Sequence, residues 1–205
     1  MRKLIFSFLS FIILTGCNYF DTPFSFNNGN SPDPEVMEIT SRDITVDGNP
    51  GDWQGIFPVV SDPAEDSAAD YEAGDIRNMY VALNPEKTAV FCLIEMDALF
   101  DEFLNAVHIN WHGSYWMNIN ITYTGSSWEG IIQIDYEMDE TIDASFPLTS
   151  TSVQSPYIEF SFERYLDTFD IMPPYEWIFI DLSYYAEPVS QETDRTNTFL
   201  CLAAE

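Results

Sequence analysis

The pattern that most constrains this chain is a succession of short apolar runs separated by clusters of turn-forming residues, from about residue 38 onward. The runs are rich in Val, Ile, Tyr, Phe and Trp, and the gaps are rich in Gly, Pro, Asp, Asn and Ser, which is typical of strands joined by turns. The runs lie near residues 44–46, 56–60, 79–84, 89–96, 105–112, 115–124, 128–138, 157–162, 176–186 and 198–204. Their number and spacing predict an all-β fold, an antiparallel β-sandwich of about ten strands.

Three further segments carry weaker signals. Residues 97–104 and 163–169 each suggest a turn or two of helix. Residues 138–156 form a long polar connection with room for another strand.

Alternation of apolar and polar residues between 107 and 136 predicts three consecutive antiparallel strands. A slip of one residue would turn the apolar side chains to the opposite face, so matching the faces restricts the register. The expected pairs are Trp111 with Tyr115 across a three-residue loop, Tyr123 with Trp128, Ile119 with Ile132, and Tyr115 with Tyr136.

The outer face of these three strands combines one tryptophan with amides, a histidine and a carboxylate. An aromatic ring surrounded by planar hydrogen-bonding groups is typical of a sugar-binding surface. The candidate ligand-binding residues are Trp116, Asn118, His108, Asn110, Gln133 and Asp135. The alternative is an ordinary solvated sheet face with a single exposed tryptophan, which needs no function.

The N-terminal segment has the features of an export signal. Arg2 and Lys3 precede an uncharged apolar run, which is too short to span a bilayer as a permanent helix. The following "LTGC" resembles the bacterial lipobox, which implies cleavage before Cys17 and attachment of lipid to its sulfur. An ordinary signal peptide with a chance cysteine is the alternative. The expected organisation is a lipoprotein signal peptide over 1–16, a lipidated cysteine and flexible linker over 17–37, and a β-sandwich over 38–205.

The charge of the chain restricts its partners. The formal net charge is −27, and two of the 7 basic residues lie in the signal segment. Nucleic acid is excluded as a partner, since binding it requires a basic face that releases counterions. Anionic lipid surfaces are disfavoured for the same reason, while cations and neutral glycans remain compatible. We therefore expect a protein tethered to a bacterial envelope membrane through its lipid, either periplasmic or surface-exposed, and able to bind an envelope protein or a glycan.

The sequence carries no catalytic motif. His108 and His112 are the only histidines, and on a strand they would lie roughly 13 Å apart, too far to share one ion. A serine hydrolase signature G-x-S-x-G is absent. We therefore expect a protein that is not an enzyme.

An acidic segment over 61–78 is a candidate calcium site. Calcium takes six to eight oxygen ligands, and Asp62, Asp66 and Asp75 are the carboxylates selected as a structural calcium site. The segment does not follow the EF-hand pattern, and a solvated acidic loop is the alternative.

Two cysteines, Cys92 and Cys201, lie in strand-like runs. In an oxidising compartment they would form a disulfide between a central and the last strand, or remain two separate buried thiols.

Three stretches of the chain resemble a known superfamily. They are "ITVDGNPGDWQGI" at 44–56, "GDIRNMYVALNPEKTAVFCLIEM" at 74–96 and, more loosely, "YIEFSFERYLDTF" at 157–169. They are similar to DOMON-like domains and in particular to the family 9 carbohydrate-binding modules. The resemblance implies a β-sandwich, a sugar site of aromatic and polar side chains, and often a structural calcium. We expect Trp53, in the first stretch, to plug one end of the sandwich.

The sequence therefore predicts a tethered lipoprotein whose sandwich binds carbohydrate without catalysis. The alternative is a structural or interaction lipoprotein of the envelope that binds another protein and no sugar.

Overall fold

The computed structural model describes most of the predicted sandwich. The described residues are 36–62, 75–97, 105–113, 115–123, 127–166, 169–170, 176–186 and 191–203. All of them belong to one compact unit, Pro32–Glu205. Its first strand begins at Val36, within the segment that the sequence assigned to the linker.

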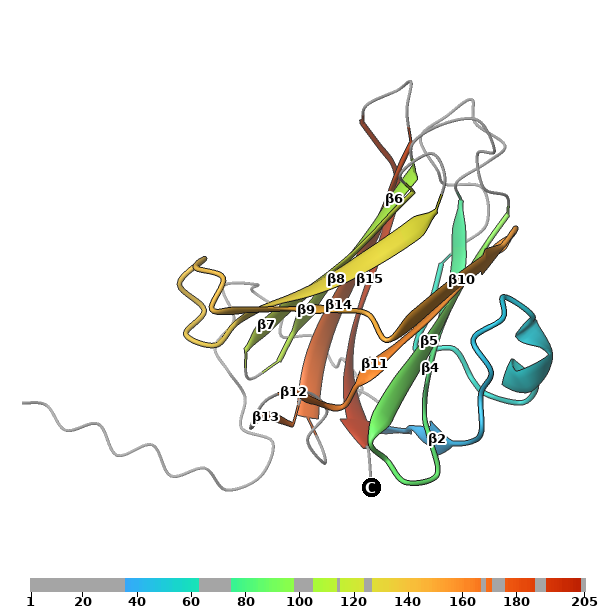
Figure 1. The fold of residues 1–205 in the computed structure, drawn as a ribbon, viewed down its shortest axis with the longest axis horizontal. Helices are drawn as coiled ribbons and strands as arrows, with labels where there is room; N and C mark the ends of the chain where they lie inside the picture. The colour runs from blue at the N-terminus through green and yellow to red at the C-terminus, as the bar shows by residue number, and fades with distance from the viewer. Residues whose placement is uncertain are drawn as a thin grey trace, which may run out of the picture. The chain divides into compact units, whose positions relative to one another are not determined.

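Two large sheets make up most of this unit (Figure 1). The first sheet has seven strands in the order β1 (Val36–Glu38), β15 (Gln191–Ala203), β14 (Glu176–Ala186), β6 (Asn105–His112), β7 (Trp116–Tyr123), β8 (Trp128–Asp135) and β9 (Ala144–Pro147). The second sheet has the order β10 (Ser150–Gln154), β11 (Tyr157–Glu163), β5 (Ala89–Met96), β4 (Ile76–Leu83) and β2 (Thr40–Ser41), and β3 (Val60–Ser61) also pairs with β4. Apart from the parallel pairs β1–β15 and β2–β4, neighbouring strands are antiparallel. The all-β sandwich predicted from the sequence is therefore confirmed.

Two local predictions were wrong. Residues 44–46 form no strand, because the backbone N–H of Thr45 donates to the Asp52 carboxylate instead of to a sheet. The segment 163–169, expected to be helical, contributes to a small pair of strands, β12 (Tyr165–Leu166) and β13 (Phe169–Asp170). The connection 138–156, expected to have room for another strand, holds two, β9 and β10. The other helical suggestion, 97–104, lies almost entirely outside the described residues.

The predicted hairpin register is half right. Between β7 and β8, Tyr123 pairs with Trp128 as expected. Between β6 and β7, Trp111 pairs with Met117, a shift of two residues from the predicted partner Tyr115. A shift of two leaves each side chain on its face, so the apolar pattern could not distinguish the two registers.

The core lies between the two sheets and contains the apolar side chains of alternating strand positions. It includes Ile109, Trp111, Met117, Ile119 and Ile132 from the first sheet, and Met79, Val81, Cys92, Ile94 and Phe160 from the second. Each of these side chains is at most 1% exposed. Burying one large apolar side chain contributes about 1.5–3 kcal/mol, so this layer is the main source of stability of the fold.

A second apolar layer lies on the other side of the second sheet, under residues 42–56, which we call the cover segment. Its short 3₁₀ helix η1 (Pro50–Trp53) lies beyond the second sheet, on the side away from the first (Figure 1). Trp53 is 3% exposed and clusters with Ile56 and with Ala82 and Leu93 of the sheet. Trp53 is therefore buried as expected, but it covers the outer face of a sheet and does not plug an end of the sandwich.

One buried carboxylate of β11 holds the cover segment in place. Glu159 is 0% exposed, and its Oε2 accepts the backbone N–H groups of Asp47 at 2.9 Å and Gly48 at 2.8 Å. Its Oε1 accepts the indole N–H of Trp53 at 2.7 Å. Hydrogen bonds to a charged acceptor contribute about 1.5–3 kcal/mol each, so the carboxylate is a strong anchor.

The cover segment is also hydrogen-bonded internally. The guanidinium of Arg42 donates to the backbone carbonyls of Asp52 and Gln54, both at 2.8 Å. The side chain of Asn49 caps the start of η1 by accepting the N–H of Gly51 at 3.0 Å, as asparagine commonly does at a helix start. The segment is therefore an ordered part of the fold.

Two glycines of the cover segment have nearly the same backbone angle but different surroundings. Gly48 has φ +82°, and a Cβ there would lie 2.8 Å from the Cβ of Gln154 and 3.1 Å from its backbone nitrogen. Gly55 has φ +83°, and a Cβ there would meet nothing within 4 Å.

We predict that Gly48→Ala destabilises the protein more than Gly55→Ala. Both variants place a side chain in left-handed backbone, which costs about 1–2 kcal/mol. Gly48→Ala adds a clash with β10, worth about 1–3 kcal/mol more. Urea unfolding of the two variants measures the difference, and equal losses would contradict the close packing of the cover segment against β10.

Candidate functional site

Most of the outward side chains of β6, β7 and β8 on the first sheet are polar. We call this set the polar face: His108, Asn110, His112, Trp116, Asn118, Asn120 and Gln133. Cross-strand pairing brings Asn118 between Asn110 and Gln133, so three amides lie in one row across the sheet. All seven side chains are half-buried, which leaves part of each open to solvent. Five of the six residues selected from the sequence are therefore brought together.

One end of the polar face is aromatic. His112 pairs with Trp116 across β6 and β7, and their ring centroids lie 5.3 Å apart at an angle of 53°. The predicted register put His112 in the loop and therefore off this face. The observed register returns it to the strand, where it extends the aromatic surface around Trp116.

The amide rows are ordered by contacts along and across the strands. Asn120 donates through Nδ2 to Oε1 of Gln133 at 3.2 Å, and it pairs in register with His108. The register continues into β14, where Ser183 pairs with His108 and is 4% exposed. The alternation of apolar and polar residues in "WIFIDLSYY" could have identified Ser183 as a further residue of this face.

Asp135, the sixth predicted ligand residue, serves a different purpose. It is 3% exposed, and its two carboxylate oxygens accept the backbone N–H groups of Asp139 at 3.3 Å and Glu140 at 2.7 Å. Glu140 has φ +70°, so the carboxylate holds an unusual backbone conformation in the turn after β8. Alternation along the strand correctly predicted the face on which Asp135 lies. It could not reveal the turn after β8, whose backbone N–H groups donate to both carboxylate oxygens.

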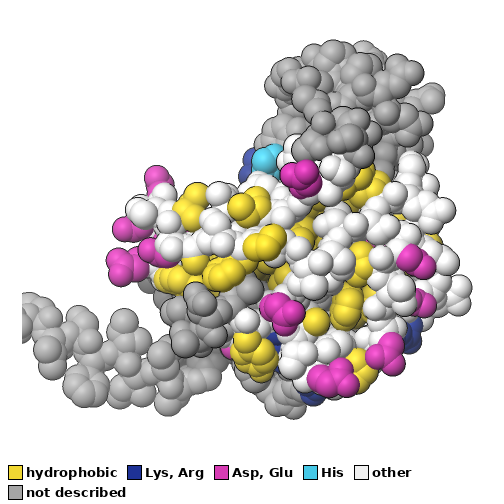
Figure 2. Space-filling view, in the orientation of Figure 1, with side chains coloured by type: hydrophobic (Ala, Val, Ile, Leu, Met, Phe, Trp, Pro, Cys, Tyr) yellow, Lys and Arg dark blue, Asp and Glu magenta, His cyan; other side chains and the backbone are white. Residues whose placement is uncertain are grey.

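The connection between β8 and β9 is strongly acidic. Figure 2 shows acidic side chains gathered at the tip of this connection, on the left of the view. Glu137, Asp139, Glu140 and Asp143 are all exposed there. This connection follows Asp135, which pairs in register with Trp116, so its carboxylates make that end of the polar face unfavourable for anionic ligands.

The predicted calcium residues lie in different surroundings. Asp75 is 3% exposed and pairs with the guanidinium of Arg77 at 3.2 Å, and Arg77 also binds Asp97. The hydrogen bond from Arg77 holds the pKa of Asp97 below its ordinary value. Asp62 follows β3, and its backbone N–H donates to the carbonyl of Arg77 at 3.0 Å. The third residue, Asp66, lies outside the described residues.

No group of three or more His, Cys, Asp or Glu side chains in the described part of the chain is arranged to hold a metal ion. Since the acidic segment 61–78 is largely outside that part, the calcium site stays a prediction.

Cys92 is a free, fully buried thiol in the core of the second sheet. Burial raises the pKa of this thiol well above its ordinary value. Cys201 lies in β15 of the first sheet, where it pairs in register with Val36 and Trp177. The disulfide considered from the sequence is therefore not formed in this structure.

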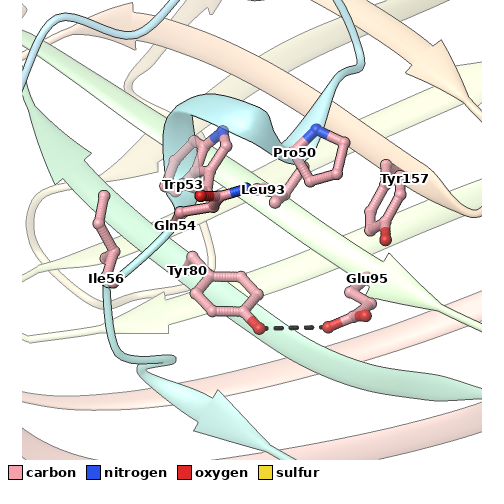
Figure 3. Close-up of a pocket in the computed structure, with 9 residues that line it drawn as sticks. Pro50, Trp53, Gln54, Ile56, Tyr80, Leu93, Glu95 and Tyr157 are labelled. Atoms are coloured by element: carbon pink, nitrogen blue, oxygen red, sulfur yellow. Dashed lines mark hydrogen bonds between the residues drawn. The ribbon is translucent and has the colours of Figure 1, made fainter.

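A second concave site, which the sequence analysis missed, lies between the cover segment and the second sheet (Figure 3). The pocket has a volume of about 240 Å³. It is lined by Pro50, Trp53, Gln54, Gly55, Ile56, Tyr80, Leu93, Glu95 and Tyr157. These residues come from four separate parts of the chain, so only the tertiary fold brings them together.

The polar part of this pocket is built around Glu95. Its Oε2 accepts Nδ2 of Asn78 at 2.8 Å and the hydroxyl of Tyr80 at 3.2 Å. Burial, the charge of Glu95 and this hydrogen bond raise the pKa of Tyr80 to about 12, with burial the largest cause. Tyr80 is therefore a neutral hydroxyl throughout the physiological range.

No family model, curated protein or solved structure matches this chain. None of the described residues forms a helix long and apolar enough to cross a membrane. The fold and the arrangement of side chains define the class of this protein: an all-β sandwich with an aromatic and amide-rich outer face on one sheet and a covered outer face on the other.

We predict that Tyr80→Phe loses less stability between pH 8 and pH 11 than the wild type does. The raised pKa means that the folded state binds the hydroxyl proton of Tyr80 more tightly than the unfolded state does. The contribution of Tyr80 to stability is therefore complete below pH 10 and is lost as the pH rises from about 10 to about 12. The melting temperature of the wild type should therefore exceed that of Tyr80→Phe by less at pH 11 than at pH 8. A difference that is the same at both pH values would contradict the assigned environment of Tyr80.

Proposed function

We propose that this protein is a lipid-anchored protein of the bacterial cell envelope whose β-sandwich binds a neutral glycan without catalysis. The observation that carries the proposal is the polar face, where the half-buried Trp116 and His112 rings adjoin a row of three amides. The sugar stacks on the indole through its apolar C–H face, and its hydroxyls exchange hydrogen bonds with the amides.

The composition of the polar face suits binding of hydroxyl groups. Asn110, Asn118 and Gln133 each offer both donors and an acceptor, which matches the dual hydrogen bonding of a sugar hydroxyl. The acidic tip at 137–143 and the net charge of −27 favour a neutral glycan over an anionic one.

Tethering to a membrane is the second part of the proposal. It is supported by the basic start, the apolar run and the "LTGC" ending at Cys17. The resemblance of residues 44–56 and 74–96 to the family 9 carbohydrate-binding modules supports the glycan as ligand. A linker between Cys17 and the first strand gives the sandwich reach from the membrane surface.

A protein partner is the second candidate. One observation favours it: Ile131 of β8 is 39% exposed and pairs in register with Asn120 on the polar face. An exposed aliphatic side chain beside amides also suits a protein interface, where apolar contact is surrounded by polar groups.

We predict that Trp116→Ala weakens glycan binding by at least about tenfold, because losing the stacking platform removes about 1.4 kcal/mol or more. Asn118→Ala should weaken it less, since one neutral hydrogen bond contributes about 0.5–1.5 kcal/mol. The measurement is a glycan array followed by calorimetry with the best neutral ligand.

Tyr165→Ala is the matched control, since Tyr165 is an aromatic side chain that is 51% exposed and belongs to the separate strand pair β12–β13. Its binding should equal that of the wild type. Glycan binding that survives Trp116→Ala would refute the assigned site. A failure to bind any neutral glycan, together with a protein partner whose affinity falls in Ile131→Asp, would favour the second candidate.

A further inference from the structure

The pocket under the cover segment has a wall of aromatic rings. Trp53 and Tyr80 approach with ring centroids 6.2 Å apart at an angle of 54°, and Tyr157 lines the same pocket from β11. Figure 3 shows Tyr80, Glu95 and Tyr157 on the sheet side of this pocket, with Pro50 and Trp53 from η1 opposite. The faces of such rings carry negative potential and attract cations within about 6 Å.

Glu95 adds a negative charge to this aromatic wall. Its carboxylate is half-buried, and the donors it accepts from among the described residues are neutral: the amide of Asn78 and the hydroxyl of Tyr80. Among the described residues, Glu95 forms no ion pair, because the salt bridges there involve Arg77 and Arg164. A partly desolvated carboxylate is stabilised by a nearby cation, so the pocket favours a positively charged occupant.

The size and ligand chemistry of the pocket restrict that cation. Calcium requires six to eight hard oxygen ligands, whereas this pocket offers a single carboxylate amid aromatic rings. The volume of about 240 Å³ lies below the roughly 300–1,000 Å³ of typical ligand clefts. A compact organic cation meets both restrictions.

We propose that this pocket binds an alkylated ammonium group, either a small free molecule or the terminal group of a larger one. The methyl groups contact the faces of Tyr80, Tyr157 and Trp53, and the positive charge lies beside the Glu95 carboxylate. The net charge of −27 raises the local concentration of such cations around the protein. The site lies on the sheet opposite to the polar face and is independent of glycan binding.

Titration calorimetry with choline chloride tests the proposal, with 3,3-dimethylbutan-1-ol as the neutral probe of the same shape and sodium chloride as the ionic control. We expect choline to bind at least tenfold more tightly than the neutral alcohol, and sodium chloride to give no binding. Equal binding of choline and the alcohol, or no choline binding at all, would overturn the proposal.

Variants locate the site. Glu95→Gln should weaken choline binding at least tenfold, whereas Glu163→Gln, an exposed carboxylate at the end of the same sheet's β11, should leave it unchanged. Tyr157→Phe keeps the ring and should bind choline, while Tyr157→Leu removes the ring and should not. Near-ultraviolet circular dichroism establishes that each variant is folded, and choline binding that survives in folded Glu95→Gln would refute the role of the carboxylate.

Discussion

The carboxylate of Glu159 is the interaction on which the arrangement of the second sheet depends. It is fully buried and accepts three N–H groups from the cover segment, two from the backbone and one from Trp53. Burying a charge is costly unless it is fully hydrogen-bonded, so β11 is compatible with this glutamate only when the cover segment is in place. The turn at 47–49 is the part of the chain that brings two backbone donors to one oxygen.

The two outer faces of the sandwich differ as a consequence. The cover segment seals much of the second sheet and leaves a small aromatic pocket beside Glu95. The strands β6, β7 and β8 of the first sheet instead present a broad row of amides and two rings. A broad polar face suits an extended neutral chain, whereas a small aromatic pocket suits a compact cation. The same sandwich therefore offers two chemically distinct surfaces.

Local alternation predicted the strands and the faces of the central hairpins, because a side chain's face depends only on its position along a strand. It could not predict pairings between distant residues: Trp53 and Glu159 are 106 residues apart, and their contact holds the cover segment on the sheet. The two-residue register shift at Trp111 and the use of Asp135 in a turn have a different, local origin. Both depend on backbone hydrogen bonds that leave the apolar pattern unchanged. The pocket around Glu95 escaped the sequence analysis because its residues converge only after folding.

A double-mutant cycle between Trp53 and Glu159 tests the central claim most directly. Urea unfolding would be measured for the wild type, Trp53→Phe, Glu159→Gln and the double variant. If the indole N–H and the carboxylate act together, Trp53→Phe should cost about 1–3 kcal/mol less in the Glu159→Gln background than in the wild type. Losses that simply add, with a coupling energy near zero, would contradict the claim that this pair holds the cover segment on the sheet.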